Sequence, residues 1–213
     1  MKYDIKIRPQ NNNTSIERLQ EWVWPTRDTG LWDGPLNDWE SSHSIKYFKY
    51  LKKTDVVIQA GGACGMYPRM FAERFQRVFT FEPNAYSFYC LVNNCSKENI
   101  VKFQAALGAG NQMCDIHGMN EDNVGICKIK EIEVDRIPIF AIDSFNFSQC
   151  DLICLDTEGY EDKIILGALR TIEKFKPVIT IELGMRDEIL SKLTPLGYKV
   201  EDQSVSDHIF VCK

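Results

Sequence analysis

The stretch from Val56 to Gly65, V-V-I-Q-A-G-G-A-C-G, constrains the fold more than any other part of the chain. An apolar strand that runs into a glycine-rich turn is typical of the first strand of an open α/β sheet, where the turn approaches a nucleoside at the carboxyl edge. Glu82 ends the next apolar stretch, where a carboxylate can accept hydrogen bonds from both hydroxyls of a ribose. Together these features predict a site for a cofactor that contains a nucleoside.

Glycines in such a turn are weak indicators by themselves. A turn between two strands needs glycine for structural reasons alone, and this would also explain Gly61, Gly62 and Gly65. The G-x-G-x-x-G spacing of dinucleotide sites is absent, because Ala63 and Met66 stand where its second and third glycines would be. A nicotinamide-dependent oxidoreductase is therefore the weaker alternative.

From Asp55 onward, segments typical of strands alternate with segments typical of helices, which is the pattern of a mostly parallel sheet covered on both faces. The predicted strands lie at Asp55–Ala60, Arg77–Phe81, Ile100–Gln104, Asp151–Leu155, Val178–Leu183, Tyr198–Asp202 and His208–Cys212. The predicted helices lie near Pro68–Phe75, Asn84–Ser96, Glu161–Lys174 and Arg186–Leu193. The last two strands are too close in sequence for a crossover helix, so they must pair antiparallel. We predict a Rossmann-like α/β fold with seven strands and a C-terminal hairpin.

Two regions depart from this alternation. Within residues 107–145, Ile126–Val134 alternates apolar and charged residues, which predicts an inserted β segment near residues 109–137 of a core domain at 55–213. Residues 1–54 form an extension, ending in a predicted helix at Ser41–Lys52. The extension contains all four tryptophans, Trp22, Trp24, Trp32 and Trp39. They either pack as a structural cap or fold over the crevice as a lid, with Asp28, Asp33 and Asp38 as polar contacts.

Composition argues against several classes of protein, although a local basic patch remains compatible with it. A formal net charge of -5 and a pI near 5.3 argue against a nucleic-acid partner or a membrane surface, because either would need a concentrated basic face. No segment approaches a membrane-spanning length, and Met1–Gln10 lacks the apolar core of a signal peptide, so a cytoplasmic location is expected. The eight cysteines show no paired C-x-x-C spacing, and most are expected to be buried thiols without metal.

Five motifs occur in a fixed order along the chain. They are V-I-Q-A-G-G-A-C-G-M-Y from Val57, F-E-P-N from Phe81, A-A-L-G from Ala105, I-D-S-F from Ile142 and L-D-T-E-G-Y-E from Leu155. Their order and spacing resemble the FkbM-type S-adenosylmethionine-dependent methyltransferases over about Asp55–Lys213. The C-terminal hairpin is also typical of the seven-stranded sheet of class I methyltransferases.

The resemblance implies S-adenosylmethionine as cofactor and a role for each matching residue. Gly61, Gly62 and Gly65 would wrap the methionine part of the cofactor, and Glu82 would bind the ribose. The remaining implied contacts are Pro83 and Asn84 beside the adenosine, Ala106 and Leu107 along the adenine, and Asp156 facing the reacting methyl group. The implied reaction is methylation of a hydroxyl oxygen on a small molecule or glycan.

Asp156 and Glu158 are the candidate bases. They are two residues apart at the carboxyl end of a predicted strand, so their side chains would point the same way if the extended conformation continues. Alternatively, Glu158 and Glu161 stabilise the start of the next helix through its dipole. A divalent metal shared by Asp156, Glu158 and Glu182 is compatible with their oxygen ligands, but nothing in the spacing demands it, and no metal site is predicted.

Gln59 departs from the family pattern, which usually has an acid at the end of the first strand. Gln59 can accept a hydrogen bond but supplies no charge to the ammonium group of the cofactor. The alternative to an enzyme is therefore a methyltransferase-like binding module that has lost turnover.

Overall fold

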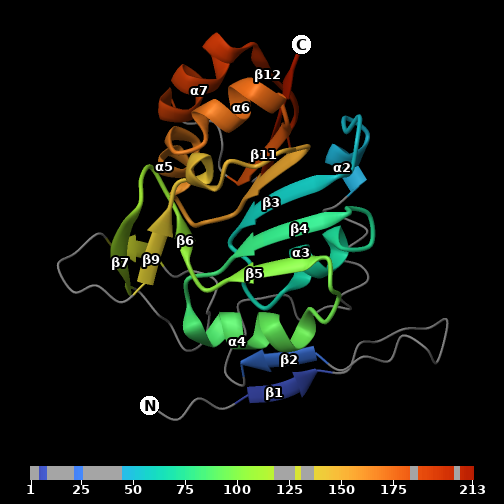
Figure 1. Ribbon diagram of the computed structural model, residues 1–213, viewed down its shortest axis with the longest axis vertical. Helices are drawn as coiled ribbons and strands as arrows, with labels where there is room; N and C mark the ends of the chain where they lie inside the picture. The colour runs from blue at the N-terminus through green and yellow to red at the C-terminus, as the bar shows by residue number, and fades with distance from the viewer. Residues whose placement is uncertain are drawn as a thin grey trace.

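A seven-stranded, mostly parallel sheet forms the centre of the computed structural model (Figure 1). The strand order is β12-β13-β11-β10-β3-β4-β5. The strands are β3 (Val56–Ala60), β4 (Arg77–Phe81), β5 (Ile100–Phe103), β10 (Leu152–Leu155), β11 (Val178–Glu182), β12 (Tyr198–Gln203) and β13 (Asp207–Cys212). Only β13 runs antiparallel to its two neighbours, β11 and β12. The predicted α/β fold with its C-terminal hairpin is confirmed.

The structure describes residues 5–8, 22–25, 45–117, 128–130, 137–182, 187–203 and 207–213. Within these ranges, no helix is both long enough and apolar enough to cross a membrane.

Helices cover both faces of the sheet, and its central strands β3 and β10 are therefore buried at every position. One face packs against α2 (Ile45–Phe48), α3 (Met66–Phe71) and α4 (Ala85–Asn94). The opposite face packs against α5 (Glu161–Leu166), α6 (Leu169–Phe175) and α7 (Asp187–Leu193), which is followed by the 3-10 turn η4 (Thr194–Leu196). The predicted helix at Ser41–Lys52 is observed only over α2, and residues 41–44 lie outside the described residues.

The single helix predicted over Glu161–Lys174 is wrong, because the chain breaks between α5 and α6. A Cβ on Gly167 would overlap the carbonyl oxygen of Gly108, so glycine is required where these two segments meet. Asp143 then starts the second helix, since its Oδ1 and Oδ2 accept hydrogen bonds from the N–H groups of Thr171 (2.8 Å) and Arg170 (3.0 Å). The apolar stripe itself is buried as predicted, with Ile164, Ile165, Ala168 and Ile172 fully inaccessible and Leu169 partly so.

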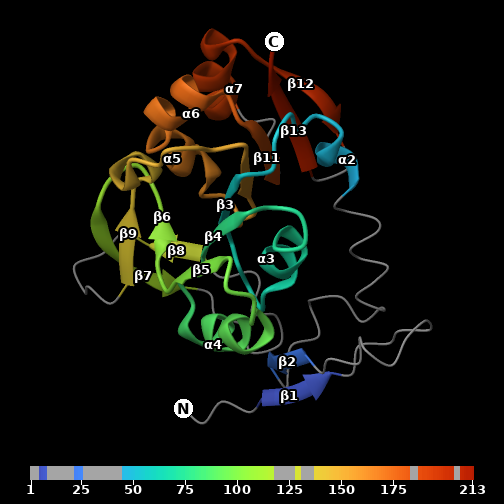
Figure 2. The same cartoon turned by 45° about the vertical axis from the view of Figure 1, so that its right-hand side comes forward.

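A smaller four-stranded sheet lies beside the carboxyl end of the central sheet (Figure 2). Its order is β6 (Ala106–Leu107), β9 (Ile137–Phe140), β7 (Gln112–His117) and β8 (Lys128–Lys130), and the 3-10 turn η3 (Ile142–Phe145) leads back to the core. The predicted strand at Ile126–Val134 is described only over β8, and its remaining residues lie outside the described ranges.

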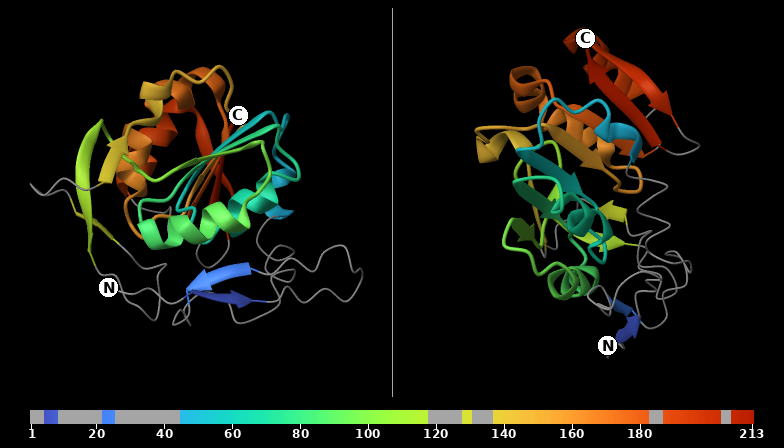
Figure 3. Two further views of the ribbon diagram at one scale, coloured as in Figure 1. Left: turned by 60° about the horizontal axis from the view of Figure 1, so that its bottom comes forward. Right: turned by 90° about the vertical axis from the view of Figure 1, so that its right-hand side faces the viewer.

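The described part of the N-terminal extension is a two-stranded ribbon of β1 (Ile5–Arg8) and β2 (Trp22–Pro25) that lies against α4 (Figure 3). Trp22 and Trp24 are 1% exposed and pack with Cys64, Met66 and Cys90 behind the glycine turn. These two rings therefore contribute to packing. The other residues of the lid hypothesis, Trp32, Trp39, Asp28, Asp33 and Asp38, lie outside the described residues.

Candidate active site

A pocket opens at the carboxyl ends of β3, β4 and β10, bordered by the smaller sheet. Seven of the residues predicted for the site line it: Gly61, Glu82, Pro83, Ala106, Leu107, Asp156 and Glu158. Six others that were not predicted complete the lining: Ala60, Ala63, Phe81, Ile116, Ile129 and Thr157. The predicted residues Gly62, Gly65 and Asn84 lie behind the lining.

Glu82 is a buried carboxylate of this pocket. Its Oε2 accepts a hydrogen bond from the Ala63 N–H (2.7 Å), and its Oε1 accepts one from the Asn84 N–H (2.8 Å). Burial raises the pKa of Glu82 to about 7, although the two backbone hydrogen bonds act to lower it. Because each carboxylate oxygen has a second lone pair, Glu82 is fixed in direction and can still accept hydrogen bonds from ligand hydroxyls.

The three glycines of the turn have different roles. Gly61 has φ +83°, and a Cβ there would overlap the carbonyl oxygen of Asp156, so the turn and the end of β10 touch through backbone alone. Gly62 and Gly65 face α4 instead: their added Cβ atoms would meet the Leu91 side chain at 2.5 Å and the Cys95 Sγ at 2.7 Å. Of the three, only Gly61 borders the pocket.

Gln59 supports the turn from within the core. It is completely buried, and its Nε2 donates hydrogen bonds to the carbonyl oxygens of Gly61 (2.7 Å) and Ala60 (3.2 Å). Its Oε1 accepts a hydrogen bond from the Thr80 hydroxyl. A carboxylate could not donate to these carbonyls, so the amide at this position holds the turn through bonds that an ionised acid would lose. Gln59 does not line the pocket.

The loop after β10 turns sharply instead of continuing as a strand. Glu158 has φ +54° and Gly159 has φ +104°, so the extended conformation assumed for Asp156 and Glu158 ends here. Glu161 holds this loop: it is 1% exposed, and its Oε1 accepts hydrogen bonds from the Thr157 N–H (3.0 Å), the Thr157 hydroxyl (3.0 Å) and the Gly159 N–H (3.1 Å). Its side chain therefore reaches back to the loop from the first turn of α5.

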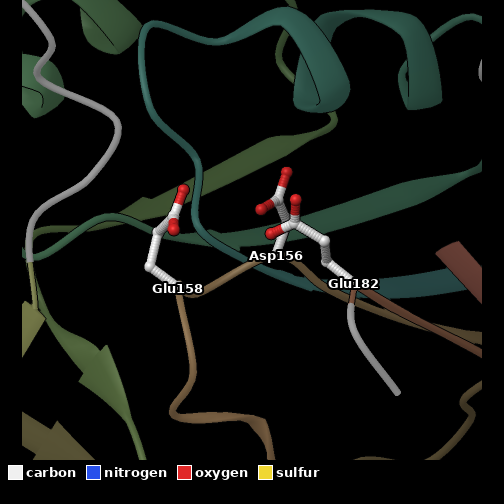
Figure 4. A group of neighbouring side chains, drawn as sticks. All are labelled: Asp156, Glu158 and Glu182. Carbon is white, nitrogen blue, oxygen red and sulfur yellow. The ribbon is translucent and has the colours of Figure 1, made fainter. Parts of the chain in front are cut away.

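Three carboxylates gather at this edge of the sheet (Figure 4). Asp156 follows β10 and Glu182 ends β11, and these parallel strands pair with Leu155 opposite Ile181, so that the two acids come side by side. Glu158 joins them from the turn, and one oxygen from each residue lies within 4.8 Å of the others. Burial raises the pKa of Asp156 well above its usual range, and the neighbouring carboxyls of Glu182, Glu158 and Asp207 raise it further.

The pocket residues that the sequence did not indicate are mostly apolar. Ile116 and Ile129 come from β7 and β8 of the smaller sheet and face the pocket from the side opposite the central strands. Ile129 lies in the alternating segment Ile126–Val134, which predicts a half-exposed strand but not what its apolar face covers, and Ile116 lies outside that segment. The pocket therefore combines apolar walls with two kinds of carboxylate, Glu82 and the group around Asp156.

The sequence was compared with models of known protein families, and one of them matches more than half of the chain. The sequence model described as "Methyltransferase FkbM domain" matches residues 64–200. No curated protein sequence matches the chain.

One solved structure supports the fold, and a second is reported as similar. The FkbM methyltransferase from Methylobacillus flagellatus superposes with a TM-score of 0.54 at 19% sequence identity, covering 74% of this chain and 43% of that one. The chain thus spans less than half the length of that protein. A putative methyltransferase from Streptococcus mutans in complex with SAH matches with a TM-score of 0.47 at 8% identity, covering 76% of this chain and 91% of the other.

Proposed function

This chain belongs to the FkbM methyltransferase family, and we propose that it transfers a methyl group from S-adenosylmethionine to a hydroxyl oxygen of a small molecule or glycan. One observation carries the proposal: a single pocket contains both an oriented carboxylate suited to a ribose, Glu82, and a partly buried carboxylate with a raised pKa, Asp156, as the candidate base. The hydroxyl acceptor is an inference from the family.

The residues present fit a nucleoside cofactor. Gly61 borders the pocket without a side chain, and the place that its Cβ would take is occupied by the carbonyl oxygen of Asp156. Glu82 can accept hydrogen bonds from both ribose hydroxyls while its backbone bonds keep it in place. Pro83, Leu107 and Ile116 supply apolar surface for a planar base. Asn84 acts indirectly, since its N–H fixes Glu82 and its Oδ1 caps α4 through the Tyr86 N–H (2.9 Å).

When bound, S-adenosylmethionine supplies an electrophilic methyl group: the acceptor oxygen bonds to the methyl carbon while the carbon–sulfur bond breaks and its electron pair stays on sulfur. The protein has to align the acceptor, exclude water and remove the hydroxyl proton. We assign removal of the hydroxyl proton to Asp156. Glu158, which lines the same pocket, is the second candidate for this role. The apolar side chains of Phe81, Ile116 and Ile129 line the pocket and would limit the access of water once the cofactor and acceptor are bound.

Calorimetry with S-adenosylmethionine and S-adenosylhomocysteine tests the proposal. We expect micromolar binding of both, and at least a tenfold loss of affinity in Glu82→Gln, because a neutral amide accepts hydroxyl hydrogen bonds less strongly than a carboxylate and on one atom only. Glu98→Gln is the matched control, since Glu98 is exposed and does not line the pocket. Absence of binding to the wild-type chain at millimolar cofactor would favour the non-catalytic binding module.

Cofactor affinity should depend on pH through Glu82. With a pKa of about 7, Glu82 is mostly protonated at pH 6 and mostly ionised at pH 8. Hydroxyl donors favour the ionised carboxylate, so affinity should rise about tenfold from pH 6 to pH 8, with proton release on binding below pH 7. Calorimetry in buffers of different ionisation enthalpy measures both quantities. The same slope in Glu82→Gln would assign the dependence to another group.

A further inference from the structure

The glycine turn holds one residue in a strained conformation at the edge of the pocket. Ala63 lines the pocket, and its N–H donates a hydrogen bond to the Glu82 Oε2 (2.7 Å). Its φ of +43° lies in the left-handed region, which is unfavourable for a residue with a Cβ. Such a conformation persists only where the surrounding contacts hold it. The N–H that fixes Glu82 therefore depends on support from the residues next to Ala63.

Asn94 supplies support from behind the turn. It is the last residue of α4 and is 6% exposed. Its Nδ2 donates a hydrogen bond to the carbonyl oxygen of Cys64 (2.8 Å), the residue that follows Ala63. The same amide pairs with Val23 of β2: Nδ2 donates to the Val23 carbonyl oxygen (2.8 Å), and Oδ1 accepts from the Val23 N–H (2.7 Å). One side chain thus connects the N-terminal ribbon to the turn beside the pocket.

The ribbon, which lies against α4 (Figure 3), also packs on the end of the turn directly. Its two described tryptophans form an apolar cluster there: Trp22 and Trp24 pack with Cys64 and Met66. The Cζ of Arg69 on α3 lies 4.6 Å from the centre of the Trp22 ring, which adds a cation–π contact. The ribbon lies outside residues 64–200, which the family model matches. This part of the support therefore comes from the N-terminal extension.

We propose that Asn94 is a positioning residue of the cofactor site and that docking of the β1–β2 ribbon on it raises the affinity for the cofactor. Without Val23, the Asn94 amide loses two of its three hydrogen bonds and can rotate away from the Cys64 carbonyl. The strained Ala63 would then lose the contact behind it. Coupling between two sites is reciprocal, so a cofactor that binds the ordered turn also stabilises the docked ribbon, by the same factor.

Asn94→Asp tests the connection in the full chain. The carboxylate keeps the size of the side chain and the acceptor for the Val23 N–H, but it cannot donate to either carbonyl oxygen. We expect the affinity for S-adenosylhomocysteine, measured by calorimetry, to fall at least about fivefold, the lower end of typical coupling between linked sites. Asn93→Asp is the matched control, because it places the same charge on the neighbouring, exposed residue of α4, whose Nδ2 donates to the Tyr89 carbonyl oxygen (2.7 Å). Equal affinity in the two variants overturns the proposal.

Hydrogen exchange in the wild-type chain gives a second readout that needs no variant. Saturating S-adenosylhomocysteine should slow exchange of the Val23 amide at least about fivefold, because the coupling is reciprocal. Amides of β12, at the other end of the strand order from β5, should change less. If Asn94 served packing alone, the Val23 amide would gain no more protection than β12, and that result overturns the proposal.

Exchange without cofactor separates this proposal from the transferase function, on which only the effect on affinity rests. In the cofactor-free chain, the amides of Ala63 and Val23 should exchange faster in Asn94→Asp than in Asn93→Asp. Unchanged exchange at Ala63 would show that the turn does not depend on Asn94, which overturns the proposal. If the wild-type chain binds no S-adenosylhomocysteine, the transferase proposal fails, and faster exchange in cofactor-free Asn94→Asp still supports the connection between ribbon and turn.

Discussion

Asp156→Asn should fold, bind S-adenosylmethionine with nearly wild-type affinity, and lose about 10²- to 10⁴-fold in methyl transfer, the usual contribution of a positioned general base. The amide has the shape of the carboxyl and cannot accept the hydroxyl proton. Stability should not fall, because the substitution removes a partly buried carboxyl whose pKa is raised by desolvation and by the neighbouring acids. Turnover is measured as S-adenosylhomocysteine formed with hydroxylated acceptors.

Asp187→Asn is the control for this experiment, since Asp187 is exposed at the start of α7. The melting temperature and the cofactor affinity of both variants separate a lost base from a lost fold. A turnover in Asp156→Asn equal to that of Asp187→Asn would remove Asp156 from the mechanism. Loss of cofactor binding in Asp156→Asn would instead assign this residue to the cofactor.

The elements that could be predicted from the sequence are those with local causes. The strands β3 and β10 are buried on both faces, and a strand covered on both sides is typically a nearly continuous apolar run, interrupted in β3 by Gln59. Glu82 could be predicted because one strand, one turn and one helix separate it from Gly61, and this unit has a nearly constant length. The hairpin of β12 and β13 follows from the short connection between the two strands.

The rest depends on contacts between distant segments. Asp156 and Glu182 come together through the register of β10 and β11, which no local pattern specifies. Glu161 accepts three hydrogen bonds only because the chain turns through left-handed dihedrals at Glu158 and Gly159. The break at Gly167 reflects its contact with Gly108, 59 positions earlier in the numbering. Such features require the tertiary structure.

Gly61→Ala should have the largest effect on stability, a loss of more than about 4 kcal/mol that leaves little folded protein at 37 °C. Two causes act together. At φ +83° an alanine costs about 1–2 kcal/mol by itself. In addition, the new Cβ would overlap the carbonyl oxygen of Asp156, and relief would separate β3 from β10 at the centre of the sheet. Urea unfolding followed by circular dichroism measures the loss.

Two other glycines separate these causes. Gly159 has φ +104° but no atom within 4 Å of an added Cβ, so Gly159→Ala should lose only the conformational part, about 1–2 kcal/mol. Gly110 likewise has open space around it and no positive φ, so Gly110→Ala should be nearly neutral. If Gly61→Ala were no less stable than Gly159→Ala, the glycine turn would not be in backbone contact with the end of β10. Gly61 and Asp156 would then line the same pocket without touching each other through their backbones.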